Sequence, residues 1–190
     1  MTELDRFLAA RDFLLAHPDD LDAACAGFSW PQLQHFNWAI DYFDSMARDN
    51  DAPALHIAEE SGTQARLSYR ELSRRSSQVA AFLPSLGAAR GDRVLVMLGN
   101  EVPLWETMLA AIKAGLVVIP ATPLLSGADL ADRMSRGKVR WVVTNATGRA
   151  RIAELPPEAT AGLGLILAGM DAVLPPGWID YRNSHAAPDT

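Results

Sequence analysis

Few side chains in this sequence carry the chemistry of a metal site or an acid–base site. The histidines are His17, His35, His56 and His185. None of them has a second His, Cys or carboxylate at the helical spacing that lets two side chains share a metal ion. We interpret the run 17–20 (His-Pro-Asp-Asp) as a turn, and the pair Glu59-Glu60 as solvated carboxylates at the end of a hairpin. The sequence therefore predicts neither a metal site nor a catalytic residue.

Phosphate-binding and hydrolase motifs are also missing from the sequence. Gly91-Asp92 precedes an expected strand, whereas a phosphate-binding loop leads from a strand into a helix, so we interpret it as a helix-to-strand turn. Neither Gly-x-Gly-x-x-Gly nor Gly-x-x-x-x-Gly-Lys-Ser/Thr occurs. This disfavours a dinucleotide-binding Rossmann domain, although the expected alternation of strands and helices would allow one. No Gly-x-Ser-x-Gly occurs either, which disfavours an isolated hydrolase.

Composition and charge are those of an ordinary globular protein. The 190 residues are 49% hydrophobic and 21% charged, with a net charge of −6. An acidic balance argues against nucleic acid as a partner, because phosphate backbones are bound by clustered Lys and Arg. Cys25 is the single cysteine, and we interpret it as a buried or half-buried small apolar residue. We see no signal peptide and no apolar run long enough to span a membrane, and we expect a cytoplasmic location.

The spacing of apolar residues predicts a helical N-terminal arm over residues 1–50. Helices are expected over 3–16, 19–24 and 38–48, and Asn37 is expected to cap the last of them. A hairpin should follow, with strands over 54–59 and 64–67. Ser68 and Glu71 then form a capping box, which opens a helix that reaches about Leu86.

Strands and helices alternate through the rest of the chain. Short apolar strands are expected over 93–98, 116–119, 141–144 and 163–167. Helices are expected over 103–114, 128–136 and 149–154. This alternation predicts an α/β subdomain over 51–172, with a mostly parallel sheet, right-handed crossovers and helices on both faces. Residues 173–190 are rich in Pro, Asn and Asp and are interpreted as a linker-like or disordered tail.

An ordered set of motifs in this sequence resembles the adenylate-forming enzymes, and within them the AMP-forming acyl-CoA synthetases. The motifs are Leu67-Ser-Tyr-Arg-Glu-Leu72, Arg90-Gly-Asp-Arg-Val94, the helix opening from Gly99-Asn100 to Trp105, Ala111-Ile-Lys-Ala-Gly115 through Pro120, and Trp141-Val-Val-Thr144. Upstream, Phe36-Asn-Trp-Ala-Ile-Asp41 is similar to the arm of acetyl- and medium-chain acyl-CoA synthetases. The resemblance covers roughly residues 30–170.

The resemblance implies a ligase of fatty-acid or other acyl metabolism that works in two steps. A carboxylate attacks the α-phosphate of ATP and gives an acyl-adenylate and pyrophosphate, and the thiol of CoA then displaces AMP. Mg²⁺, lysine and backbone N–H groups stabilise the phosphate charge in such reactions. This sequence has no counterpart of the family's phosphate-binding loop or catalytic lysine. We therefore expect it to be an N-terminal part of such an enzyme, inactive in adenylation by itself.

The resemblance also implies a partial site for CoA. Leu124 occupies the loop that follows the second core motif, where relatives carry small or polar residues, so its contact would be through backbone and shape. Arg149 and Arg151 fall near the position where arginines of acetyl-CoA synthetases meet the phosphates of CoA, and Arg suits phosphate for its fixed fork of donors. The alternative interpretation is that both arginines are solvated helix charges.

Three further interpretations of the chain stay open. It could be a non-catalytic remnant that binds CoA or a partner, the adenylation module of a peptide synthetase, or an unrelated Rossmann-like domain. The resemblance also implies that this sheet packs on a neighbouring subdomain. Without that neighbour, apolar faces would be uncovered, so we expect the isolated chain to self-associate, with a dimer as the simplest form.

Overall fold

The computed structural model describes residues 1–169 and 174–189. The expected boundary between subdomain and tail at 172–173 lies outside the described residues. The chain forms two compact units, Met1–Ser45 and Met46–Thr190. No helix in the described part of the chain has both the length and the apolar character needed to cross a membrane.

The first unit is helical, with α1 over Glu3–Leu15, α2 over Leu21–Gly27 and a π-helix, η1, over Trp38–Asp44. The expected α-helix over 38–48 is thus π-helical through most of its length, and only a short α3 (Ser45–Ala47) follows it. Asn37 caps η1 as predicted, because its side chain accepts from two backbone N–H groups of the first turn. Cys25 is exposed on α2, so the expectation of a buried or half-buried thiol is wrong.

The second unit opens with the predicted hairpin, formed by β1 (Pro53–Ala58) and β2 (Gln64–Ser68). It leads directly into α4 (Tyr69–Ser85) through the predicted capping box. The Ser68 hydroxyl accepts from the Glu71 N–H at 3.2 Å, and the Glu71 carboxylate accepts from the Ser68 N–H at 2.8 Å. These two bonds satisfy N–H groups that the start of a helix leaves without partners.

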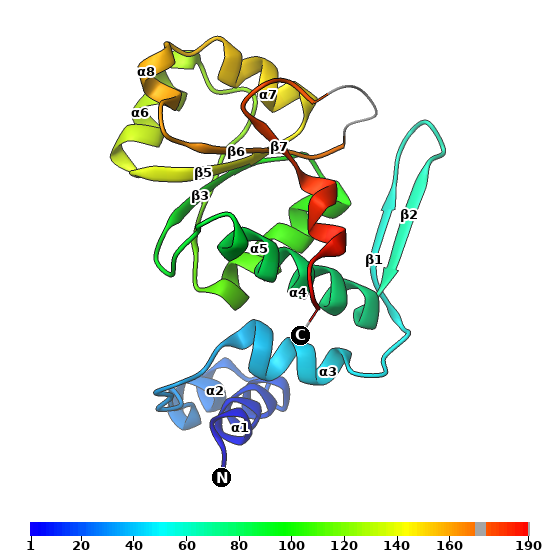
Figure 1. Ribbon diagram of the computed structural model, residues 1–190. Helices are drawn as coiled ribbons and strands as arrows, with labels where there is room; N and C mark the ends of the chain where they lie inside the picture. Colours follow the sequence, from blue (N-terminus) through cyan, green and yellow to red (C-terminus); the bar gives the residue numbers. More distant parts are fainter. Residues whose placement is uncertain (170–173, 190) are drawn as a thin grey trace. The chain divides into compact units, whose positions relative to one another are not determined.

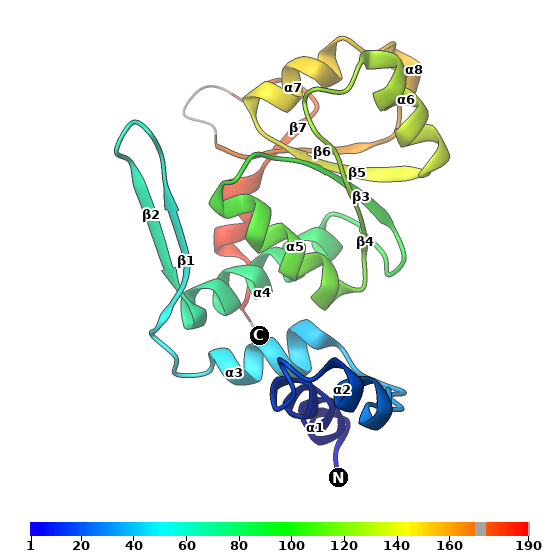
Figure 2. The same ribbon diagram turned by 180° about the vertical axis from the view of Figure 1, so that it is seen from behind.

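A parallel sheet of five strands forms the centre of this unit, in the order β4-β3-β5-β6-β7 (Figures 1 and 2). The strands are β3 Arg93–Met97, β4 Val117–Pro120, β5 Val139–Thr144, β6 Gly164–Leu167 and β7 Trp178–Asp180. β3 lies between β4 and β5, with Val94 opposite Val118 on one side and Trp141 on the other.

Helices cover both faces of this sheet. One face carries α4 and α5 (Val102–Ala114), and the other carries α6 (Gly127–Arg136), α7 (Ala146–Ala153) and the short α8 (Pro157–Thr160) (Figure 1). Alternate residues of β3 serve the two layers, because successive side chains of a strand point to opposite faces. Val94 and Val96 pack under α4 and α5, while Leu95 and Met97 pack under α6 and α7. The predicted fold class is confirmed.

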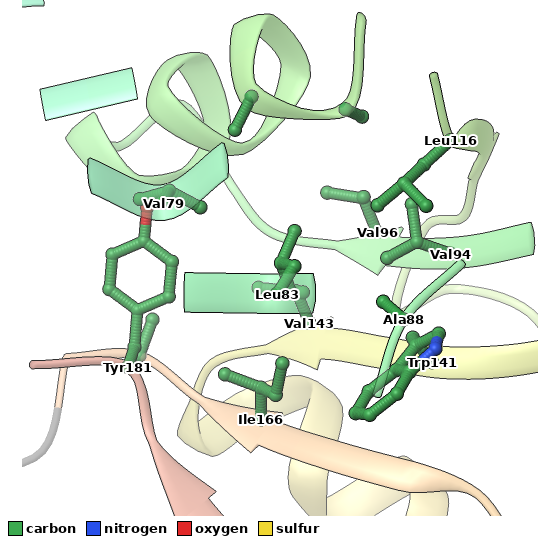
Figure 3. Packing of buried hydrophobic residues seen from close by; sticks show 13 residues of the cluster. Val79, Leu83, Ala88, Val94, Val96, Leu116, Trp141, Val143, Ile166 and Tyr181 are labelled. Atoms are coloured by element: carbon green, nitrogen blue, oxygen red, sulfur yellow. The ribbon is translucent and has the colours of Figure 1, made fainter. Parts of the chain in front are cut away.

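The interpretation of the C-terminal segment as a tail is wrong. Its residues supply the edge strand β7 and a 3₁₀-helix, η2 (Tyr181–Ala186), which packs against α4. The side chains of Tyr181 and Ser184 are buried. Figure 3 shows the Tyr181 ring inside the core cluster, with its hydroxyl directed toward Val79 of α4.

Polar contacts anchor this segment to the two helices on the same face. Arg75 of α4 and Glu106 of α5 form a buried ion pair, with Nε and Oε1 3.0 Å apart. Tyr181 donates its hydroxyl to Glu106 Oε2 at 2.8 Å, and Arg75 donates to Ser184 Oγ at 3.3 Å. Burial, together with the negative charge of Glu106, raises the pKa of Tyr181 well above its usual value. The phenol therefore stays protonated and continues to donate.

Candidate functional site

After the carboxyl ends of the neighbouring strands β3 and β5, the chain continues to opposite faces of the sheet. β3 leads into α5 on one face of the sheet, whereas β5 leads into α7 on the other. In open α/β sheets, ligands bind in the crevice that such a divergence opens. The loops that meet at this edge are 98–101 after β3, 121–126 after β4 and residue 145 onward after β5. We take this edge as the candidate site.

Glu101 connects two of these loops. Its Oε1 atom accepts from the Gly99 N–H at 3.1 Å and from the Asn145 side-chain amide at 2.6 Å. The Asn145 Oδ1 atom in turn accepts from the Gly148 N–H at 3.1 Å and so caps α7. Sequence reasoning missed this pair. Part of the signal was present, since Asn145 directly follows β5 and Glu101 lies in the loop after β3, and the loops after neighbouring parallel strands meet at one sheet edge.

The start of α7 lies very close to the sheet, and Gly148 makes that possible. A Cβ atom on this glycine would lie 1.9 Å from Thr144 Oγ1 and 3.0 Å from Met97 Sδ. Thr144 is itself buried and donates its hydroxyl to the Met97 carbonyl oxygen at 2.7 Å. The absence of a side chain at residue 148 therefore sets how deep α7, and the arginines on it, lie against β3 and β5.

Of the three residues predicted to bind CoA, the structure brings Arg151 into contact with the loop that carries Leu124. Arg151 Nε donates to the carbonyl oxygen of Pro123 at 3.0 Å, in the loop that carries Leu124. The Arg151 guanidinium also pairs with Glu154 at 3.2 Å. Leu124 itself is 88% exposed, and its N–H donates to Thr122 Oγ1 at 3.2 Å. Arg151 thus holds the loop, and its Nε and Nη1 donors already have partners.

Arg149 lies apart from Arg151, because residues two apart on a helix do not face each other. Its side chain is half-buried, and its Nε atom is buried without a hydrogen-bond partner among the described residues. A buried donor of this kind is costly unless a partner satisfies it, and an anionic oxygen is the strongest partner for a guanidinium. Arg149 therefore fits a phosphate group. In residues 1–169 and 174–189, no three His, Cys, Asp or Glu side chains are grouped to hold a metal ion.

Comparison with known families decides what kind of chain this is. The model of the family described as AMP-binding enzyme matches residues 42–186. The chain belongs to this family. The match begins near the end of η1 and includes all five strands of the parallel sheet as well as η2.

Curated relatives within the AMP-binding family are acyl-CoA ligases. A mitochondrial acyl-coenzyme A synthetase of Homo sapiens is 35% identical over 115 residues, which cover 57% of this chain and 20% of that protein. The 4-hydroxybutyrate–CoA ligase 1 of Metallosphaera sedula is 31% identical over 125 residues, or 64% of this chain and 22% of that protein. The chain thus spans about a fifth of the length of these relatives.

Solved structures agree with this assignment. The Brucella canis acyl-CoA synthetase superposes with a TM-score of 0.74 at 25% identity, over 95% of this chain and 32% of that one. The acetoacetyl-CoA synthetase of Streptomyces lividans superposes with a TM-score of 0.73 at 25% identity, over 85% of this chain and 27% of that one. The resemblance to acyl-CoA synthetases that the motifs predict is confirmed.

Proposed function

We propose that this chain supplies the N-terminal α/β part of an ATP-dependent carboxylate–CoA ligase. The ligase converts a carboxylic acid to an acyl-adenylate and then to an acyl-CoA, with release of pyrophosphate and AMP. Its substrates are ATP with Mg²⁺, a fatty or other carboxylic acid, and CoA, and we propose that it works in the cytoplasm. The family match over residues 42–186, with acyl-CoA synthetases among the relatives, is the observation that carries this proposal.

Adenylation by this chain alone is expected to be undetectable. The phosphate-binding loop and the lysine that the reaction requires have no counterpart in this sequence, so the charge that develops on the α-phosphate would be unstabilised. The measurement is exchange of radiolabelled pyrophosphate into ATP, with acetate, hexanoate and benzoate as acids and a full-length acyl-CoA synthetase as the positive control. Acid-dependent exchange above the no-enzyme background would show that the expectation is wrong.

We further propose that Arg149 binds a phosphate group of CoA, while Arg151 and Leu124 shape the loop beside it. In a full-length ligase that contains this chain, Arg149→Ala should raise the KM for CoA by about tenfold to a hundredfold, as expected for one lost bond to a charged group. Arg151→Ala should have a smaller effect, because its Nε and Nη1 donors are already held by Pro123 and Glu154. The KM for ATP should not change.

A matched control for these substitutions is Arg136→Ala, which removes an exposed arginine from α6. This variant should leave both KM values as they are. If the double variant Arg149→Ala, Arg151→Ala also leaves the KM for CoA unchanged, the CoA assignment is wrong and both side chains are solvated helix charges.

We also propose that the isolated chain self-associates through the face formed by α5 and the edge strand β4. Trp105, Ile112 and Val117 are large apolar side chains that are each at least 40% exposed there. Exposed apolar patches beside an unprotected edge strand favour association. Light scattering after size exclusion should show a dimer or larger species, and Val117→Lys should shift it toward monomer. A monodisperse monomer that binds no hydrophobic dye would contradict this proposal.

A further inference from the structure

Glu101 stands at the start of α5, but its side chain does not serve that helix. It is the N-cap residue of α5, and it makes no side-chain bond to the N–H groups of the first turn. A short polar side chain such as Ser or Asp at this position would satisfy one of those donors. The carboxylate instead accepts from the Gly99 N–H and from the Asn145 amide. The side chain therefore contributes to a contact between two loops rather than to α5.

The Glu101 carboxylate lies at the carboxyl ends of three neighbouring strands. Gly99 is in the loop after β3, and Asn145 directly follows β5. Gly169 is in the loop after β6, and a Cβ atom on it would lie 3.9 Å from Glu101 Oε2. One carboxylate thus lies beside all three loops, at the edge of the sheet that forms the candidate site.

Asn145 carries this contact into α7. Its side-chain Nδ2 donates to Glu101 at 2.6 Å, and its Oδ1 accepts from the Gly148 N–H at 3.1 Å. A carboxylate only accepts, so turning the amide over would place two acceptors face to face. The backbone carbonyl oxygen of Asn145 accepts from the Arg149 N–H at 2.8 Å. Asn145 therefore bonds to the two residues that close the first turn of α7.

α7 depends on contacts of this kind because it is short. It has eight residues, and a helix of that length is marginal in water without tertiary contacts. Asn145 fixes its start, and Gly148 lies against the sheet. Arg151 fixes its far end to the carbonyl oxygen of Pro123. Arg149 lies between these points, so the place of its guanidinium is set by contacts that other residues make.

We infer that Glu101 is a positioning residue for CoA, because through Asn145 it holds the turn of α7 from which Arg149 meets a phosphate group. The inference rests on the proposed binding of CoA phosphate by Arg149. Charge alone predicts the opposite effect, since a carboxylate repels a nearby phosphate and its removal would strengthen binding. Positioning predicts that its removal weakens binding. The direction of the change therefore separates the two roles.

The first test is Glu101→Ala in a full-length ligase that contains this chain. The KM for CoA should rise about fivefold to tenfold, less than for Arg149→Ala, because the guanidinium is still present but is less well placed. The matched control is Glu158→Ala, which removes an exposed carboxylate from α8 and should leave the KM for CoA unchanged. A KM that is unchanged or lower in Glu101→Ala would overturn the inference.

Asn145→Asp is a second test, because it keeps a cap on α7. Asn and Asp cap helices about equally well, and a negative charge suits a helix N-terminus, so a residue that only caps α7 would tolerate this change. Beside Glu101, however, two carboxylates would repel each other, and the KM for CoA should rise about tenfold. Adding Glu101→Gln restores a donor and should bring the KM back to within about threefold of the parent. An unchanged KM in Asn145→Asp, or no recovery in the pair, contradicts the inference.

A double-mutant cycle shows whether Glu101 acts through Arg149. In an Arg149→Ala background, Glu101→Ala should change the KM for CoA by less than about twofold, because the group that it positions is gone. If Glu101→Ala keeps its full effect there, the inference is wrong while the CoA assignment stands. If Arg149→Ala alone leaves the KM unchanged, the proposed CoA site is wrong and the inference fails with it.

Pyrophosphate exchange separates positioning from a general structural role, because this half of the reaction does not involve CoA. A positioning role raises the KM for CoA in Glu101→Ala and in Asn145→Asp without an equal loss of exchange. If exchange falls as much as CoA use in both variants, Glu101 supports the fold as a whole and the inference is overturned.

Discussion

Glu106→Ala is expected to lower the free energy of unfolding by about 3–5 kcal/mol, the cost of removing one partner from a buried ion pair. The cost arises because the substitution leaves the Arg75 guanidinium buried without its partner. Arg75 is 7% exposed and Glu106 is 3% exposed, so the guanidinium would stay in a place where water cannot replace the lost carboxylate. The substitution also removes the acceptor for the Tyr181 hydroxyl. The anchor of η2 would therefore loosen together with the contact between α4 and α5.

Urea unfolding followed by tryptophan fluorescence measures this loss. Glu154→Ala is the matched control, because it breaks an exposed pair with Arg151 that should contribute about 0–1 kcal/mol. The double variant Arg75→Met, Glu106→Leu should recover most of the stability, since apolar side chains of similar size avoid the unpaired charge. Limited trypsin digestion should cut after Arg182 faster in Glu106→Ala than in the parent. If the free energy of unfolding of Glu106→Ala lies within about 1 kcal/mol of the parent's, the buried pair between Arg75 and Glu106 is not needed for stability.

Gly148→Ala is expected to destabilise the fold by about 1–3 kcal/mol, the usual cost of overpacking a core. The direction of this change in stability is informative. Inside a helix, replacing glycine by alanine normally stabilises a protein by about 1 kcal/mol. Here the added methyl would lie 1.9 Å from Thr144 Oγ1, so α7 must move away from the sheet or Thr144 must give up its bond to Met97.

The control for this variant lies in the same helix. Ala153→Gly changes an exposed position of α7 and should cost only about 1 kcal/mol, from helix propensity alone. Thermal unfolding of both variants compares the two effects directly. Because α7 carries Arg149 and Arg151, a full-length ligase with Gly148→Ala should also show a raised KM for CoA. A Gly148→Ala variant more stable than the parent would contradict the close packing described for this turn.

Most elements of this fold could be predicted because their signals are local. The capping box at Ser68 and Glu71 marks the start of α4 within four residues of sequence. Gly115 ends α5 in a left-handed conformation that glycine adopts without strain. The apolar run of β3 indicates a strand covered on both faces. Each of these features depends on neighbours in the chain, and a single sequence contains them.

The C-terminal segment could not be predicted in the same way, because what holds it is distant in sequence. Residues 175–180 (Pro-Pro-Gly-Trp-Ile-Asp) look like a linker by composition, yet Trp178–Asp180 pairs with β6. Arg75 and Glu106 are charged, and no local pattern shows that they are buried partners. The candidate site shows the same limit. The motifs drew attention to Arg149 and Arg151, but the bond from Arg151 to Pro123 and the link between Glu101 and Asn145 required the arrangement of the strands.

The docking of η2 on α4 has a consequence for how the protein is made. The bond between Arg75 and Ser184 joins residues 109 positions apart. At a synthesis rate of about 5–20 residues per second, α4 would leave the ribosome roughly 5–20 seconds before this partner exists. During that interval, the side of α4 that η2 will cover is open to water and to other nascent chains. Chaperones that recognise exposed apolar helices would therefore meet this protein while η2 is still being translated.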